Sequence, residues 1–311
     1  MNARFDNVGE GLMDPIATRC EFRGDGVVLA ADRWDPPTRD DNGVDIDRKG
    51  VVLLLHGGGQ TRHSWRNTGR NLAADGWSAI AEDARGHGDS QWAPDGDYGI
   101  DALVADLTAI IGELGEKPVL VGASMGGMTS LIGQGENPEL ARGVVLVDIA
   151  PKVETEGTDE IAAFMRSGLD GFDSLDDAAA AIAAYTPNRV RKSNPQGLRK
   201  NLRLRDGRWF WHWDPAFLRH GDEPTRQADS IMRYERARDA AAAITVPTML
   251  VRGQQSNVVS EEGAKELLDL IPTATLIDVS GAGHMVAGDD NDVFSGGLKE
   301  FLDDRVVTAR P

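Results

Sequence analysis

One serine lies among glycines in a setting that could make it a nucleophile. Residues 122–126 read Gly-Ala-Ser-Met-Gly, which matches the G-x-S-x-G pattern of a serine on a sharp turn between a strand and a helix. An apolar run precedes Ser124 and a helix is expected over 125–135, so the pattern has the flanks it needs. Small residues also fill ordinary strand-to-helix turns. The pattern therefore acquires meaning only if the chain supplies a base, an acid and an oxyanion site.

A second glycine-rich run could supply the oxyanion site. Residues 56–60 read His-Gly-Gly-Gly-Gln and follow the apolar run at 51–55. Glycine lets a backbone bring its N–H groups close to a substrate oxygen. We expect the N–H groups of Gly58 and Met125 to form the oxyanion hole, with Gly59 as the nearest substitute. The helix that begins at Met125 adds its positive amino-terminal end to the same place.

Apolar runs of strand length alternate with helical patterns along most of the chain. Near-continuous apolar strands separated by helices predict a mostly parallel sheet covered by helices on both faces. Two strands at 16–23 and 27–34 flank a Gly-Asp-Gly turn signal and are expected to pair as a hairpin. The other expected strands are 51–56, 78–83, 117–124, 143–150, 246–253 and 274–281, and the expected helices are 64–76, 99–115, 125–135, 260–271 and one ending near residue 304.

The strand pattern stops between residues 151 and 243. This segment is first rich in alanine, which favours helix, then basic, and then aromatic. The simplest organisation is one α/β core domain, residues 1–150 and 244–311, interrupted by a helical cap over 151–243.

Composition narrows the classes of function. The formal net charge of −17 argues against nucleic acid as a partner, because phosphate contacts need a basic face. No apolar run approaches the roughly 20 residues of a membrane span, and the amino terminus has no apolar signal segment. Cys20 is the only cysteine, which excludes an internal disulfide and a cysteine-based zinc site. We expect a cytoplasmic protein with no membrane partner; whether it forms a homodimer stays open.

Four motifs, taken in order, resemble the α/β-hydrolase fold family, in its serine-nucleophile branch of esterases and lactonases with a helical cap. They are HGGG at 56–59, DARGHGDS at 83–90, GASMGG at 122–127 and GAGHM at 281–285. The resemblance covers nearly the whole chain outside the expected cap. It implies the α/β-hydrolase fold, and it implies that Arg85 and His87 brace the nucleophile turn and take no part in the chemistry.

The resemblance also bears on the base and the acid. His284 follows the last expected strand, where the family places its catalytic histidine. Many members carry the acid in a G-x-x-D pattern after the strand that ends here at Gly253, but this chain has Ser256 and Asn257 there. Some relatives place the acid one strand earlier, which is where Asp148 stands. Adjacent parallel strands lie about 4.8 Å apart, so a carboxylate at Asp148 can still reach the histidine.

Other interpretations of the acid remain. Asp148 could instead only cap the entry to the expected cap. Weaker acid candidates are Asp278, inside a strand, and the run of Asp289, Asp290 and Asp292 after the histidine. If Asp148 is the acid, it orients His284, His284 removes the proton of Ser124, and no metal or cofactor is needed.

Tryptophans and cations in the expected cap bear on the substrate. Trp209, Trp211 and Trp213 alternate, so on a strand-like stretch they would share one face; they either pack the cap or form an apolar wall over the serine. Gly59, Trp65 and Met285 are further expected substrate contacts. The basic residues of this region are either a solvated face or an attraction for anionic substrates: Arg189, Arg191, Lys192, Arg199, Lys200, Arg203, Arg205 and Arg208.

The expected function is hydrolysis of a carboxylic ester or lactone of a small, apolar or aromatic molecule through an acyl-enzyme on Ser124. The same triad would serve a C–C bond hydrolase, a thioesterase or a cofactor-free perhydrolase. A ligand receptor that kept the hydrolase fold is a second class of function. An inactive scaffold is a third, for which the missing carboxylate at Ser256–Asn257 is the hint.

Overall fold

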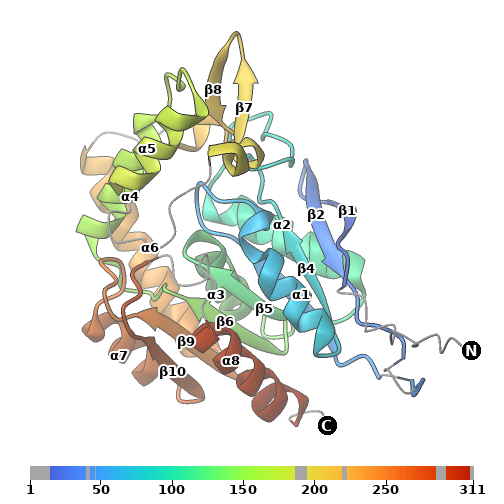
Figure 1. Ribbon diagram of the computed structural model, residues 1–311. Helices are drawn as coiled ribbons and strands as arrows, with labels where there is room; N and C mark the ends of the chain where they lie inside the picture. The colour runs from blue at the N-terminus through green and yellow to red at the C-terminus, as the bar shows by residue number, and fades with distance from the viewer. Residues whose placement is uncertain are drawn as a thin grey trace, which may run out of the picture.

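The computed structural model describes residues 15–39, 43–45, 47–185, 195–218, 223–284 and 292–308. Its centre is an eight-stranded sheet in the order β1-β2-β4-β3-β5-β6-β9-β10 (Figure 1). β1 and β2 pair as an antiparallel hairpin, β2 pairs antiparallel with β4, and the remaining neighbours are parallel. The strands are β1 Thr18–Arg23, β2 Val28–Trp34, β3 Gly50–Leu55, β4 Trp77–Glu82, β5 Val119–Ala123, β6 Gly143–Val147, β9 Thr248–Gly253 and β10 Ala274–Val279.

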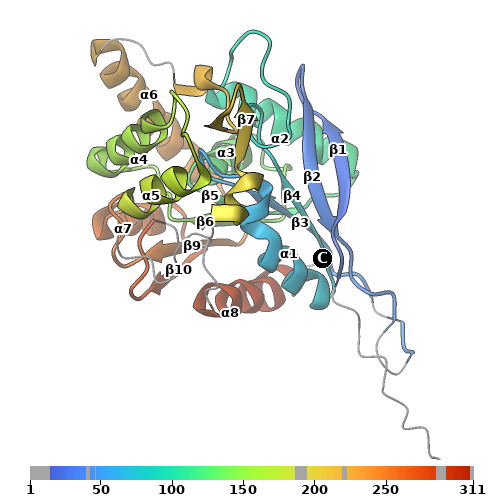
Figure 2. The same cartoon turned by 45° about the horizontal axis from the view of Figure 1, so that its top comes forward.

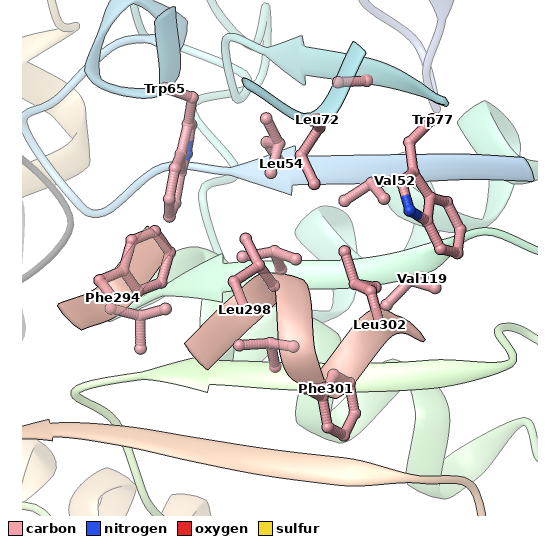
Figure 3. Packing of buried hydrophobic residues seen from close by; sticks show 14 of the residues in the cluster. Val52, Leu54, Trp65, Leu72, Trp77, Val119, Phe294, Leu298, Phe301 and Leu302 are labelled. Atoms are coloured by element: carbon pink, nitrogen blue, oxygen red, sulfur yellow. The ribbon is translucent and has the colours of Figure 1, made fainter. Parts of the chain in front are cut away.

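Helices cover both faces of this sheet, as the doubly wound pattern predicts. One face carries α1 and α8, whose side chains pack against Val52 and Leu54 of β3 (Figure 3). The alternate residues of the same strand, Leu53 and Leu55, belong to the cluster on the opposite face. The helices around the sheet are α1 Arg66–Ala74, α2 Ile100–Leu114, α3 Met125–Glu136, α7 Glu261–Leu270 and α8 Asp292–Phe301, with short helical turns at Arg62–Trp65 and Leu302–Val307.

The chain between β6 and β9 forms an inserted segment that rises above the carboxyl ends of the parallel strands (Figures 1 and 2). It was expected to be helical, and this expectation was incomplete, because the segment also contains an antiparallel hairpin of β7 Leu202–Arg205 and β8 Arg208–Trp211. Each strand has four residues, too few for a clear alternating pattern. The helical parts are α4 Thr155–Ser167, α5 Leu175–Tyr185, α6 Glu223–Ala243 and short turns at Pro195–Lys200 and Pro215–Leu218.

The inserted segment returns to the sheet through α6. Ala237, Ala240 and Ala241 at the end of this helix are buried in the cluster that also holds Leu131 and Ile132 of α3. A Cβ on Gly135 of α3 would lie 2.2 Å from the carbonyl oxygen of Ala240, so the two helices approach closely. Residues 151–243 as a separate domain stay a prediction. Among the described helices, none combines the length and apolar composition needed to cross a bilayer.

Candidate active site

Ser124 occupies a strained turn between β5 and α3. Its φ of 47° and ψ of −112° define a backbone conformation that residues other than glycine rarely adopt. Such backbone strain is characteristic of functional turns. A Cβ on Gly122 would lie 2.4 Å from the carbonyl oxygen of Gly126, so the turn closes only with glycine there. The N–H of Ser124 donates to Val147 O at 3.1 Å, which sets the serine beside the end of β6.

Asp148 follows Val147 and lies next to His284. Nδ1 of His284 is 2.7 Å from Oδ2 of Asp148, and the carboxylate side chain is fully buried. The other carboxylate oxygen, Oδ1, accepts the N–H of Gly253 at 3.1 Å. Because an ionised carboxylate only accepts, the proton of this bond resides on Nδ1 of His284, which leaves Nε2 as the basic nitrogen.

The two residues in the usual acid position have other partners. The hydroxyl of Ser256 donates to Oδ2 of Asp148 at 2.5 Å. Nδ2 of Asn257 donates instead to Glu160 of α4 at 2.6 Å, on the surface. Asp278, a weaker acid candidate, is engaged by Arg252 at 3.1 Å. Asp289 and Asp290 lie outside the described residues, as does the side chain of Asp292.

Hydrogen bonds within the glycine-rich loop distinguish its amides. The N–H of Gly59 donates to Nε2 of His87 at 3.1 Å, and the N–H of Gly57 donates to the side chain of Gln60. Among the described residues, no acceptor is found for the N–H of Gly58. Met125 is the first residue of α3, so its N–H has no acceptor within the helix. Within the described part of the chain, the N–H groups of Gly58 and Met125 are therefore available to a substrate oxygen, whereas the N–H of Gly59 is already bonded.

Three buried histidines, His56, His87 and His212, lie close to one another at this loop. The ring centroids of His56 and His87 are 5.2 Å apart, and those of His87 and His212 are 5.8 Å apart. Burial lowers the pKa of His56 to about 4 and that of His87 to about 3, and it holds the pKa of His212 well below its usual range. The rings are neutral near pH 7, so each can accept a backbone N–H: Ala84 donates to His56, Gly59 to His87 and Gly88 to His212.

Residues 50–290 match the sequence profile of the alpha/beta hydrolase fold. The chain belongs to this family. It is 30% identical to esterase Rv0045c of Mycobacterium tuberculosis over 70% of each chain. It is 28% identical to the mouse sn-1-specific diacylglycerol lipase ABHD11, covering 81% of this chain and 80% of the relative. Among solved structures, that of E-2-(acetamidomethylene)succinate hydrolase superposes with a TM-score of 0.75 at 23% identity, over 93% of this chain and 100% of that one. The protein is a hydrolase of α/β fold.

Side chains from the inserted segment of the hydrolase cover the glycine-rich loop. A Cβ on Gly59 would lie 3.2 Å from Cε of Met165 and 3.4 Å from Trp213. A Cβ on Gly58 would lie 3.6 Å from the ring of Phe217, which also packs edge-on against His87 at 4.9 Å. Sequence reasoning missed Met165 and Phe217, because neither lies in a motif and only packing brings them to the loop.

The tryptophans expected to contact substrate lie in different places. The rings of Trp211 and Trp213 stack at 4.9 Å and are buried, and Trp209 lies half-buried beneath the Arg199 guanidinium. Trp65 was expected to contact substrate, and this expectation was wrong. Its side chain is 1% exposed and lies in the core cluster on the face of the sheet that carries α1 and α8, against Phe294 (Figure 3). The helical turn at 62–65 directs the ring into the core. Met285 lies outside the described residues.

Four arginines of the basic run, Arg199, Arg203, Arg205 and Arg208, have identified partners in the hydrolase structure. Arg203 binds Asp89, Arg205 lies over the ring of Trp92, and Arg208 binds Asp173. Arg189, Arg191 and Lys192 lie outside the described residues. Within the described part of the chain, no three His, Cys, Asp or Glu side chains are grouped so as to hold a metal ion.

Proposed function

We propose that the protein is a serine hydrolase that cleaves a carboxylic ester or lactone of a small apolar or aromatic molecule. Ser124 is the nucleophile, His284 the base and Asp148 the acid. The observation that carries the proposal is the 2.7 Å contact between Nδ1 of His284 and the buried carboxylate of Asp148. This contact fixes the tautomer in which Nε2 can accept the proton of the serine hydroxyl.

Acylation begins when Nε2 of His284 takes the proton of Ser124 Oγ and the oxygen bonds to the carbonyl carbon. The N–H groups of Gly58 and Met125 hold the resulting oxyanion, and the positive end of α3 lies at the same point. The tetrahedral intermediate then breaks the bond to the alkoxy oxygen, which leaves with the proton that His284 returns. In a lactone the leaving alcohol stays tethered to the acyl group.

Deacylation repeats these steps with water. His284 removes a proton from water, the hydroxide oxygen bonds to the acyl carbon, and the bond to Ser124 Oγ breaks as the serine regains its proton. The carboxylic acid product then departs. Asp148 remains ionised throughout and stabilises the imidazolium that forms twice in each cycle.

Two observations support an apolar or aromatic substrate. Met165, Trp213 and Phe217 cover the loop that carries the proposed oxyanion donors. Arg199 and Arg205 lie over tryptophan rings, and Arg203 and Arg208 pair with aspartates, which disfavours a polyanionic substrate. An ester substrate is also consistent with the relative named sn-1-specific diacylglycerol lipase ABHD11.

The test uses the purified protein with a fluorophosphonate probe and a series of 4-nitrophenyl esters. Intact mass should rise by one adduct in the parent and stay unchanged in Ser124→Ala, which identifies the nucleophile without knowledge of the substrate. Turnover should be highest for medium-chain or aryl esters and should be lost in Ser124→Ala. A labelled but flat ester profile would contradict the substrate class, and absence of labelling would contradict the serine mechanism.

A further inference from the structure

The turn after β9 brings a serine hydroxyl to the proposed acid. Ser256 stands where many members of the family carry the acid itself, and its Oγ lies 2.5 Å from Oδ2 of Asp148. We infer that Ser256 is a positioning residue, whose hydroxyl holds the Asp148 carboxylate in the orientation that His284 requires. The inference rests on the proposed function, because it takes Asp148 and His284 as parts of a serine hydrolase site.

The direction of this hydrogen bond follows from the other partners of Ser256. The N–H groups of Val258 and Val259 each donate to Oγ at 3.1 Å. A hydroxyl has two acceptor positions and one proton. Both acceptor positions are filled by backbone amides, so the proton points to Asp148.

The carboxylate of Asp148 is then held at both oxygens. Oδ1 accepts the N–H of Gly253, and Oδ2 accepts both the hydroxyl of Ser256 and Nδ1 of His284. A fully buried charge is tolerated when such donors replace water. Gly253 ends β9 and Ser256 lies in the turn that follows, so this end of the strand and its turn fix the rotation of the carboxylate plane and direct Oδ2 toward the histidine.

The same turn is fixed from outside by α4. A Cβ on Gly157 would lie 2.2 Å from the carbonyl oxygen of Asn257, and the Asn257 side chain binds Glu160. Ser256 could therefore serve only to hold residues 256–259 in place. A positioning role and a purely structural role differ in their predictions for the proton between His284 and Asp148. If Ser256 orients Asp148, its removal changes the environment of that proton together with kcat.

The experiment compares Ser256→Ala, Ser256→Thr and Ser260→Ala with the parent. Ser260 is a matched control, because its hydroxyl caps α7 by accepting the N–H of Gly263 and touches no proposed catalytic group. The readouts are kcat and KM on a 4-nitrophenyl ester, melting temperature, and the downfield ¹H NMR resonance of the His284 Nδ1 proton, assigned by its loss in His284→Gln.

Ser256→Ala should lower kcat about 10- to 100-fold at unchanged KM, as expected for one hydrogen bond to a charged group. It should also move the downfield resonance, and Ser256→Thr should restore both. Ser260→Ala should lower only the melting temperature. The inference is overturned if Ser256→Ala keeps the parental kcat and resonance while melting earlier.

The resonance is measured in the resting protein, so it tests Ser256 even if no ester is turned over. A parent that takes no fluorophosphonate label would defeat the proposed function, whereas an unmoved resonance in Ser256→Ala would defeat only the positioning role. If Ser256→Ala does not fold, Ser256→Cys keeps a similar volume with a weaker donor, and the same shift is expected there.

Discussion

The backbone N–H of Gly59 donates to Nε2 of His87 across 3.1 Å. This bond removes one of the two candidate amides of the glycine-rich loop from substrate binding. It also ties the buried His87 of the Arg-Gly-His-Gly segment to the backbone of the loop that carries Gly58.

Substitutions in this loop should therefore differ sharply between neighbours. Gly59 has a φ of +72° and would place a Cβ 3.2 Å from Met165, so Gly59→Ala is strained in backbone and in packing. Gly58→Ala keeps its N–H and meets Phe217 at an ordinary 3.6 Å. We expect kcat on an aryl ester to fall at least about tenfold in Gly59→Ala and much less in Gly58→Ala. The reverse order would show that the amide assignment is wrong.

Asp148→Asn should remove most of the activity without unfolding the protein. Asparagine fits the φ of 50° at this position, but its amide favours the tautomer of His284 that protonates Nε2. We expect kcat to fall by roughly 10³- to 10⁴-fold, with a melting temperature close to that of the parent. Asn257→Ala is the control: it loses the surface contact with Glu160 but keeps the backbone contact with Gly157, so kcat should fall far less than in Asp148→Asn. Equal losses in both variants would argue against Asp148 as the acid.

Glu82 predicts an unusual dependence of stability on pH. Burial at the end of β4, with Asp83 and Asp106 nearby, raises the pKa of this carboxyl well above its usual range. The folded state therefore keeps a proton that the unfolded chain loses above about pH 4.5. The contribution of Glu82 to the free energy of unfolding is fully present below that pH and is lost as the pH rises.

Glu82→Gln removes this titration. The variant should exceed the parent in free energy of unfolding by on the order of 1 kcal/mol at pH 8 and by much less at pH 5. Urea unfolding at the two pH values measures the difference. The exposed Glu300→Gln should show none, and a gain that does not depend on pH would refute the role of Glu82.

The buried histidines predict the opposite trend in acid. The pKa of His87 is lowered to about 3, so the unfolded chain takes up a proton below about pH 6.5 that the folded protein refuses. The contribution of His87 to the free energy of unfolding is fully present at neutral pH and declines as the pH falls. His87→Gln can still accept the N–H of Gly59 but does not titrate. Its free energy of unfolding should fall less steeply between pH 6 and 4, by about 1.4 kcal/mol per pH unit. If the free energies of unfolding of parent and variant fall in parallel with pH, His87 is not the source of the pH dependence.

Arg203 anchors the β7–β8 hairpin to the loop that carries His87. It donates to Gly88 O at 2.7 Å and to Asp89 at 2.8 Å. Arg208 makes comparable contacts to Gly171 O and Asp173, but within the inserted segment. Arg203→Ala should lower kcat/KM several-fold and speed limited proteolysis of the segment. Arg208→Ala should leave kcat/KM unchanged, and matched effects of the two variants would rule out a specific anchoring role.

Where the sequence was informative, local pattern coincided with a strong tertiary constraint. The apolar runs predicted the inner strands of the central sheet, because strands buried on both faces tolerate few polar residues. The largely exposed β1 was predicted with β2 from the Gly-Asp-Gly turn signal between them. β7 and β8 escaped prediction, since their four-residue strands carry arginines and depend on pairing with each other. The serine turn has its own signature in glycines, whereas the contacts of Ser256 with Asp148 and of Phe217 with the glycine-rich loop join segments that meet only in three dimensions.

The hairpin and α4 leave and rejoin the sheet between two neighbouring strands. Val144 of β6 pairs directly with Thr248 of β9, so this sheet could accommodate a different insertion without changing a single ladder. The inserted segment nevertheless touches the loops around the proposed oxyanion amides and the proposed acid. His212 accepts the N–H of Gly88, Phe217 lies against Gly58, and Glu160 of α4 binds Asn257. A chimera with the insertion of a relative would therefore fold on an intact scaffold and exchange selectivity and turnover together. In this architecture an exchange of the inserted segment would change substrate specificity as one unit, together with part of the catalytic rate.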